Sequence, residues 1–185
     1  MDEVTTDRLD LRRFDRDVVD ELALVFAHRE VWEFPMGRAL THDETAAFVD
    51  AQVQHWDEHG FGVWIATTRA DGAVIGYVGL AIPTFLPEIL PAVEVGWRFA
   101  PDAWGKGYAT EGATAALDEA FSTLGLREVC SLPQTDNPRS GRVAAGLGMR
   151  LTRVVEVPAN ERRGAVLADH YEITADEWRA RRGRS

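Results

Sequence analysis

The segment from Glu94 to Glu111 constrains the fold more than any other part of the chain. Apolar and polar side chains alternate from residue 92 to residue 100, which is the pattern of a β-strand with one buried face. A proline turn and two glycines, Gly105 and Gly107, follow, and the apolar spacing then becomes helical as far as about residue 123. A strand that leads through a glycine-rich loop into a helix predicts an α/β arrangement, and the start of such a helix exposes unpaired N–H groups that attract anions.

The other apolar patterns predict further strands and helices without a linker, a repeat or a low-complexity block. Strands are expected at residues 8–12, 61–68, 73–82, 127–132, 149–157 and 166–173, and helices at 15–28, 41–59, 137–148 and from 174 onward. Asp71-Gly72 predicts a hairpin turn. Thr41 with Glu44 and Thr174 with Glu177 have the spacing of a capping box, which predicts a helix start at each place. The sequence therefore predicts one domain over residues 1–185, an α/β fold with a mixed sheet of six or seven strands flanked by helices, and a frayed tail at 179–185.

The chain is acidic, with 20 basic and 30 acidic side chains and a net charge of −10. This balance argues against nucleic acid as a partner and favours cations such as protonated amines, with acidity that only maintains solubility as the alternative. The single cysteine, Cys130, excludes an internal disulfide and a zinc site made of several cysteines, and its apolar neighbours predict a buried, inert thiol. No metal site and no membrane partner are expected. Without an apolar leader or an apolar run of about 20 residues, the expected class is a soluble cytoplasmic protein.

The glycine-rich loop can be compared with three cofactor-binding motifs. A Walker A loop requires Ser or Thr where Gly107 stands, and a Rossmann fingerprint requires a third glycine where Thr110 stands, so both fail. The third motif is the acyl-coenzyme A loop of the GNAT N-acetyltransferases, Gln/Arg-x-x-Gly-x-Gly/Ala. Residues 104–109 match it, except that Trp104 replaces Gln or Arg. For the loop alone, a tight structural turn is the alternative. Lys106, the only lysine of the chain, lies inside it.

Several segments together carry a family resemblance. They are Thr6 to Arg12, Glu94 to Trp97, Trp104 to Glu111, Asn137-Pro138-Arg139-Ser140 and Leu147-Gly148-Met149. In this order and spacing they resemble the GNAT superfamily, and within it the branch of the ribosomal-protein N-acetyltransferases (RimJ/RimL type), over nearly the whole chain. The resemblance implies a GNAT fold, acetyl-CoA as co-substrate and a primary amine as acceptor, either a protein N-terminus or a small molecule. A homodimer is the family-level expectation.

The resemblance also implies where acetyl-CoA binds. Its pantetheine arm would follow the strand before the loop, and its pyrophosphate would lie on the loop itself. The implied cofactor-binding residues are Trp97, Arg98, Phe99, Trp104, Gly105, Lys106, Gly107, Tyr108, Ala109, Thr110, Asn137 and Arg142. Arg139 and Arg142 are candidates for the ribose phosphate, with solvated helix arginines as the alternative. For Asn137 a plain helix cap is the alternative.

The family transfers the acetyl group by direct attack of the amine on the thioester, without an acyl-enzyme. The reaction needs a base for the amine and a proton for the departing thiolate. Glu94 is the candidate base, because burial raises the pKa of a carboxyl group; a solvated strand glutamate is the alternative, and His170 is the competing base. Ser140 is the candidate that assists the thiolate, with a first-turn helix serine as the alternative.

The first two helices and their connector, residues 29–40, are expected to cover the acceptor. Trp32, Phe34 and Met36 in this connector and the proline-rich loop at 83–91 are candidate walls of its pocket, with core packing as the alternative. The leading hypothesis is an acetyl-CoA-dependent N-acetyltransferase. An acyl-CoA-binding regulatory relative without turnover is the alternative, and an unrelated nucleotide-binding α/β protein is a third class.

Overall fold

One sheet of eight strands, in the order β1-β2-β3-β4-β5-β6-β8-β7, carries the other elements. The computed structural model describes residues 2–161 and 163–183. The strands are β1 (Glu3–Thr5), β2 (Leu9–Arg13), β3 (Val63–Thr68), β4 (Val74–Ala81), β5 (Glu94–Phe99), β6 (Glu128–Ser131), β7 (Arg150–Val157) and β8 (Val166–Thr174). The helices are α1 (Val19–Phe26), α2 (Glu33–Met36), α3 (His42–His59), α4 (Tyr108–Asp118), α5 (Pro138–Gly146) and α6 (Ala175–Arg182).

The mixed α/β sheet confirms the predicted fold class, with eight strands where six or seven were expected. The additional strand is β1, whose three residues are too few to show an alternating pattern. The predicted hairpin at Asp71-Gly72 joins β3 to β4. All described strand pairs are antiparallel except β5 with β6, which run parallel.

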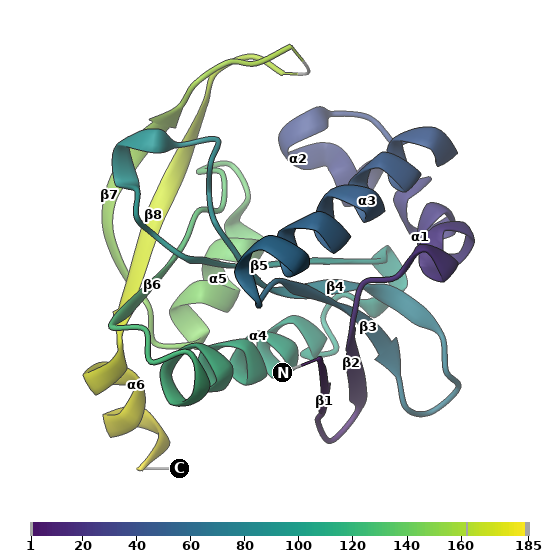
Figure 1. The fold of residues 1–185 in the computed structure, drawn as a ribbon. Helices are drawn as coiled ribbons and strands as arrows, with labels where there is room; N and C mark the ends of the chain where they lie inside the picture. The colour runs from purple at the N-terminus through teal and green to yellow at the C-terminus, as the bar shows by residue number, and fades with distance from the viewer. Residues whose placement is uncertain (1, 162, 184–185) are drawn as a thin grey trace.

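The helices lie on both faces of the sheet (Figure 1). On one face α1 and α3 pack against each other and enclose an aromatic cluster that includes Phe26, Trp32 and the partly buried Phe48. On the other face α4 packs on β4 and β5, and α5 and α6 contact β8. The larger core cluster lies there, and it contains Val95 and Phe99 of β5. Strand β5 therefore lies between two helix layers, with α1 and α3 on one side and α4 on the other.

Helices α3 and α6 begin at the predicted capping residues. Thr41 and Glu44 form a reciprocal capping box at α3, and Thr174 and Glu177 form one at α6. Helix α6 continues through Arg182, beyond the point at which the tail was expected to start; residues 184 and 185 lie outside the described residues. Within the described chain, no helix combines the length and the apolar character needed to cross a bilayer.

Helix α4 approaches the sheet closely at a glycine. A Cβ atom added to Gly112 would lie 2.5 Å from Cγ1 of Val78 on β4, well inside van der Waals contact. Gly112 and Val78 are both buried, so neither neighbour has free space into which it can move. The short distance between α4 and β4 positions the start of α4 relative to the end of β5.

We expect Gly112→Ala to lower the free energy of unfolding by about 1–3 kcal/mol, because the added methyl group overpacks the contact with Val78. Gly146→Ala is the matched control: a Cβ there meets nothing within 4 Å, and alanine favours a helix by about 1 kcal/mol over glycine. Urea denaturation of the three proteins measures the difference. Equal or opposite shifts for the two variants would show that α4 does not press on the sheet at this position.

Candidate active site

The strands β5 and β6 meet at one position and then separate. The register pairs Glu94 with Cys130, and the Cys130 N–H donates to the Val93 carbonyl at 2.9 Å. Strand β6 ends at Ser131, whereas β5 continues to Phe99, and Figure 1 shows the two strands diverging. Beyond Glu94, the edge of β5 that faces β6 has no strand partner among the described residues. We call this opening the fork.

The peptide groups of Trp97 face the fork. Ala100 N–H donates to the Ile75 carbonyl at 2.8 Å, so by the alternation of an antiparallel ladder residues 98 and 96 also pair with β4. The N–H and C=O groups of residues 97 and 99 therefore point away from β4, toward the fork. The Phe99 carbonyl accepts a hydrogen bond from Nε1 of Trp104 at 2.8 Å. The Trp97 N–H and C=O remain, and they can pair with an extended chain as an added strand would.

Glu94 lies at the closed end of the fork. Its Oε1 accepts a hydrogen bond from the Leu132 N–H at 3.3 Å. Burial raises the pKa of Glu94 to about 7, although the bond from Leu132 acts in the opposite direction. A carboxyl group that titrates near neutrality can accept a proton and release it again at physiological pH. The partly buried, hydrogen-bonded Glu94 side chain thus differs from a fully solvated strand glutamate, and its role as the base stays a prediction.

The glycine-rich loop lies at the open end of β5, between a 3₁₀ turn (Pro101–Ala103) and α4. Gly105 and Gly107 have φ values of 73° and 84°, a left-handed conformation that favours glycine. A Cβ at Gly105 would meet nothing within 4 Å, and one at Gly107 would meet only the Arg8 side chain, at 3.3 Å. Open backbone at the start of an 11-residue helix, beside the exposed Lys106, is suited to binding a pyrophosphate.

Arg8, on the β1–β2 turn, supports this loop together with Glu111 of α4. Nη1 of Arg8 donates to the Lys106 carbonyl at 2.8 Å, and its Nε donates to Oε2 of Glu111 at 2.7 Å. Thr6 donates to Oε1 of Glu111 at 2.6 Å, and the arginine also lies 4.8 Å from the centre of the Tyr108 ring. Burial tends to raise the pKa of Glu111, but these hydrogen bonds and the guanidinium charge together lower it. Both residues lie in the resembling segments, but nothing in their spacing indicated this contact.

Trp104 and Arg139 connect the loop to α5. The Arg139 guanidinium lies 4.1 Å from the centre of the Trp104 ring, a cation–π contact. Its nearest described carboxylate is that of Glu33 on α2, at 4.0 Å, and both side chains are half exposed. Arg142, one turn further along α5, is exposed with no described ion pair. The structure thus distinguishes a fixed arginine at 139 from a free one at 142.

The start of α5 brings Asn137, Ser140 and Tyr171 together. The Asn137 side chain caps the helix by accepting a hydrogen bond from the Ser140 N–H at 3.3 Å. The Tyr171 hydroxyl lies 3.2 Å from the place that a Cβ of Gly141 would occupy, next to Ser140. Tyr171 is thus a second hydroxyl beside this helix turn. No spacing in the sequence links β8 with the start of α5, so sequence reasoning missed it.

The Arg98 side chain lies on the α1–α3 face of the sheet. Its Nη1 donates to the carbonyls of Val31 and, at 2.9 Å, Phe34, and its Nε donates to the Tyr77 hydroxyl at 3.2 Å. The Arg98 peptide pairs with β4. Arg98 as a cofactor contact stays a prediction, but its described contacts hold the connector on β5. Of the predicted connector residues, Trp32 is buried, whereas Phe34 and Met36 are partly exposed.

His170 and Cys130 are both buried. Nδ1 of His170 lies 3.1 Å from the Thr152 hydroxyl and 3.1 Å from Oε1 of Glu172. Burial lowers the pKa of His170 and raises that of the Cys130 thiol. Such a thiol is a poor nucleophile, as the sequence indicated, and His170 already has two polar partners. Among the described residues, no group of three or more His, Cys, Asp or Glu side chains is arranged to hold a metal ion.

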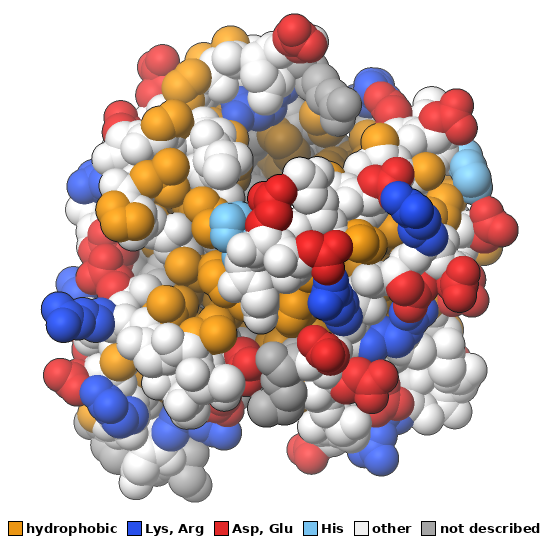
Figure 2. Space-filling model, in the orientation of Figure 1, with side chains coloured by type: hydrophobic (Ala, Val, Ile, Leu, Met, Phe, Trp, Pro, Cys, Tyr) orange, Lys and Arg blue, Asp and Glu red, His pale blue; other side chains and the backbone are white. Residues whose placement is uncertain are grey.

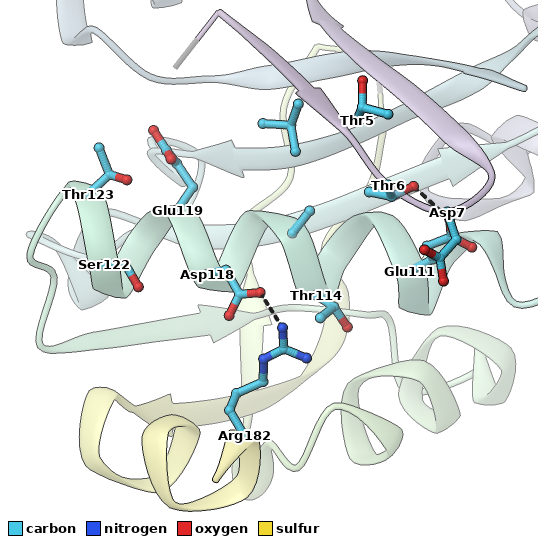
Figure 3. A pocket seen from close by; sticks show the side chains of 12 residues that line it. Thr5, Thr6, Asp7, Glu111, Thr114, Asp118, Glu119, Ser122, Thr123 and Arg182 are labelled. Atoms are coloured by element: carbon cyan, nitrogen blue, oxygen red, sulfur yellow. Dashed lines mark hydrogen bonds and ion pairs between the residues drawn. The ribbon is translucent and has the colours of Figure 1, made fainter. Parts of the chain in front are cut away.

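A hollow and a pocket mark two different sides of the molecule. Figure 2 shows the hollow between the β7–β8 hairpin and helices α2 and α3, with hydrophobic side chains at its floor. The predicted wall at 83–91 lies on this face, where buried Leu86 packs with β6 to β8. The pocket, of about 500 Å³, lies between β1, α4 and Arg182 of α6 (Figure 3). Its polar lining includes Glu111 and Asp118, and it contains none of the predicted site residues.

The sequence matches the family model of the acetyltransferase (GNAT) domain over residues 8–150. It is 40% identical over 147 residues to the uncharacterized N-acetyltransferase YnaD of Bacillus subtilis, covering 80% of this chain and 82% of that one. It is 34% identical over 157 residues to the FsC-acetyl coenzyme A-N(2)-transacetylase of Aspergillus fumigatus, covering 77% of this chain but only 63% of that protein.

Solved structures share the fold at lower identity. A GNAT-family acetyltransferase from Bacillus anthracis superposes with a TM-score of 0.76 at 20% identity, covering 94% of this chain and 99% of that one. The spermidine N-acetyltransferase from Vibrio cholerae, in complex with CoA and spermine, gives a TM-score of 0.71 at 18% identity, covering 92% of this chain and 97% of that one. At these identities the likeness shows a shared fold.

We expect Glu94→Gln to remove a pH-dependent part of the stability. The pKa of Glu94 in the folded protein, about 7, is above the ordinary value of 4.5, so the folded protein binds this proton more tightly than the unfolded chain does. The stabilisation is complete below the ordinary pKa and is lost as the pH rises through the folded pKa. Between these values the wild type should lose up to about 1.4 kcal/mol per pH unit relative to the variant.

Urea midpoints measured from pH 4 to pH 8 test this expectation for wild type and Glu94→Gln. Glu88→Gln, which changes an exposed glutamate on the 83–91 loop, is the control and should follow the wild type. If the wild-type and Glu94→Gln curves run parallel over this range, Glu94 is not a carboxyl group with a raised pKa.

Proposed function

This chain belongs to the GNAT acetyltransferase family, and we propose that it transfers the acetyl group of acetyl-CoA to a primary amine by direct attack in a ternary complex. The observation that carries the proposal is the fork, with the titrating carboxyl of Glu94 at its closed end and the open glycine loop beyond the other end of β5. A long, thin, anionic co-substrate fits this arrangement, because its chain can pair along β5 while its phosphates bind at α4.

Acetyl-CoA supplies the activated acetyl group as a thioester. The N–H groups from Gly105 to Thr110 would hold its pyrophosphate, with Lys106 and Arg139 as nearby cations. The Trp97 peptide would hold the pantetheine arm. These residues fit the group because two positive-φ glycines leave the loop backbone bare and because the Trp97 peptide has no described strand partner on the side of the fork. Asn137 and Arg142 stay candidates at the α5 side.

The proton transfers are assigned to two groups. Deprotonated Glu94 accepts a proton from the ammonium group of the acceptor, directly or through water, so that a neutral amine can attack. Ser140 donates a hydrogen bond to the departing thiolate, and the nearby Tyr171 hydroxyl is the second candidate for this role. The buried Cys130 has no part in the reaction, which agrees with direct transfer.

The acceptor is a peptide N-terminus or a small amine in this proposal. A putative ribosomal-protein-serine acetyltransferase from Vibrio cholerae has the same fold, with a TM-score of 0.76 at 18% identity, and it supports the RimJ/RimL-like branch only by likeness of fold. A homodimer and a cytoplasmic location stay family-level expectations. The fork and the raised pKa of Glu94 favour turnover over a regulatory protein that only binds acyl-CoA.

We expect Gly107→Val to abolish binding of acetyl-CoA, because a branched side chain at φ 84° strains the loop and fills the phosphate cradle. Isothermal titration with acetyl-CoA measures the loss. Gly125→Val is the matched control, since Gly125 also has a positive φ of 64° in an exposed turn with nothing within 4 Å of its Cβ. Tight binding of acetyl-CoA by Gly107→Val, or binding of NADH or ATP in its place by the wild type, would contradict the proposal.

We expect Glu94→Gln to lower kcat by about 10²–10⁴-fold at neutral pH, because the amine loses its general base. The wild-type rate should rise as the pH passes through about 7, the pKa of Glu94, and the variant should lack this step. Above the pKa of the amine the difference should narrow. Thiol release from acetyl-CoA with a panel of amines measures the rate, and titration should show unchanged affinity for acetyl-CoA. An unchanged pH profile would remove Glu94 from the mechanism.

A further inference from the structure

A guanidinium group lies under the connector without a counter-ion. Arg98 is partly buried, and its three described hydrogen bonds go to two backbone carbonyls and to the Tyr77 hydroxyl, all uncharged acceptors. No carboxylate lies within ion-pair distance of it among the described residues, in a chain with a net charge of −10. Its Nη2 donates no described hydrogen bond. A cation that is withdrawn from water is usually paired with an anion, and Arg98 has no such partner among the described residues.

The ring beneath this guanidinium also has an unused donor. The Arg98 guanidinium carbon lies 3.9 Å from the centre of the Trp32 ring, and Trp32 is only 8% exposed. Nε1 of Trp32 is buried and has no hydrogen-bond partner in the described structure. Phe26 and Phe48 pack against the ring, with centroids 5.0 and 6.0 Å away, and they offer no acceptor. Buried indole N–H groups usually have an acceptor, so a second donor is unsatisfied at the same place.

Both unsatisfied donors belong to the face of β5 that carries Glu94. Side chains alternate along a strand, so Glu94 and Arg98 project to the same side, the side covered by the connector. What is missing beside Arg98 and Trp32 is a hydrogen-bond acceptor with negative charge. The chain itself supplies none among its described residues.

We propose that the acceptor substrate is a small amine that also carries a carboxylate, held by Nη2 of Arg98 and Nε1 of Trp32 while its amine faces Glu94. The inference rests on the proposed function, because it places the acceptor on this face. The Cα atoms of Glu94 and Arg98 are about 13 Å apart along the strand, and the two long side chains take up part of this distance, so several bonds separate the amine from the carboxylate. The chemical class is therefore an ω-amino acid or an amino acid with a side-chain amine.

The connector closes over the bound carboxylate. Nε1 of Trp32 has no solvent contact in the described structure, so the hydrogen bonds from Arg98 to Val31 and Phe34 must loosen as the carboxylate enters. Polycations such as spermidine do not suit this position, because a second ammonium group would approach the guanidinium. This separates the proposed acceptor from the spermine in the Vibrio cholerae complex.

A binding experiment on the wild type tests the contact without turnover. The six tryptophans give six indole N–H signals in a ¹H–¹⁵N correlation spectrum, and Trp32→Phe identifies the signal of Trp32. Titration of the CoA-saturated protein with 6-aminohexanoate or lysine should shift this signal, whereas hexylamine or cadaverine should not. The internal control is Trp178, whose Nε1 already donates to Asp118 at 2.8 Å and whose signal should stay in place.

A kinetic experiment tests whether the enzyme prefers amines that carry a carboxylate. Wild-type kcat/KM should be at least tenfold higher for lysine than for cadaverine, and for 6-aminohexanoate than for hexylamine. Trp32→Phe and Arg98→Gln should reduce these ratios several-fold, because each raises KM for the carboxylate-bearing member more than KM for the plain amine. Trp178→Phe should keep the wild-type ratios.

Three results would overturn the proposal. The first is a Trp32 signal that no carboxylate shifts, which would mean that a buried water satisfies Nε1. The second is a higher kcat/KM for cadaverine or spermidine than for lysine, and the third is an equal loss for both members of a pair in Trp32→Phe. Absence of thiol release with every amine would instead contradict the proposed function, and the titration of the Trp32 signal would still decide whether a carboxylate binds.

Discussion

The early separation of β5 from β6 is the constraint on which the site depends. The two strands share one paired position, Glu94 with Cys130, and the rest of β5 keeps one edge free. Such an exposed strand edge is normally a liability, because its peptide groups can pair with another chain. Here β5 is held rigidly by six register positions with β4 and by α4 on its other face. The free edge is therefore a fixed template for a strand-like ligand and not a frayed end.

Local charge near this edge differs from the charge of the whole chain. The net charge is −10, yet the start of α4 presents bare backbone N–H groups, with Lys106 of the preceding loop and Arg139 of α5 nearby. The nearest acidic side chain on α4, Glu111, is neutralised by Arg8, and it faces the pocket on the β1 side. An acidic protein can thus bind a polyanion. Salt screens electrostatic interactions over about 10 Å, so the charges next to the site determine whether an anion binds there. Net charge was a poor guide to the co-substrate.

Much of the fold was predictable because its signals are local. The alternation in β5, the capping boxes at Thr41 and Thr174 and the glycine loop each depend on residues within one turn or one strand of each other. The contacts between Arg8 and Glu111 and between Trp104 and Arg139 join residues far apart in sequence, and no spacing reveals them. The sequence did not indicate the contacts of the Arg98 side chain with Val31, Phe34 and Tyr77, because it shows alternation but not which layer covers each face.

The alternation along β5 explains how one short strand can serve two substrates. Peptide groups at Trp97 turn toward the fork, because residues 96 and 98 use theirs to pair with β4. The side chains of Glu94 and Arg98 project to the face covered by the connector, while Val95 and Phe99 fill the core beneath α4. Along this strand the free peptide groups therefore face the fork, whereas the polar side chains face the connector. In the proposed reaction, a thioester that pairs with the backbone edge and an amine that enters from the connector side would approach each other at the closed end of the fork, beside Glu94.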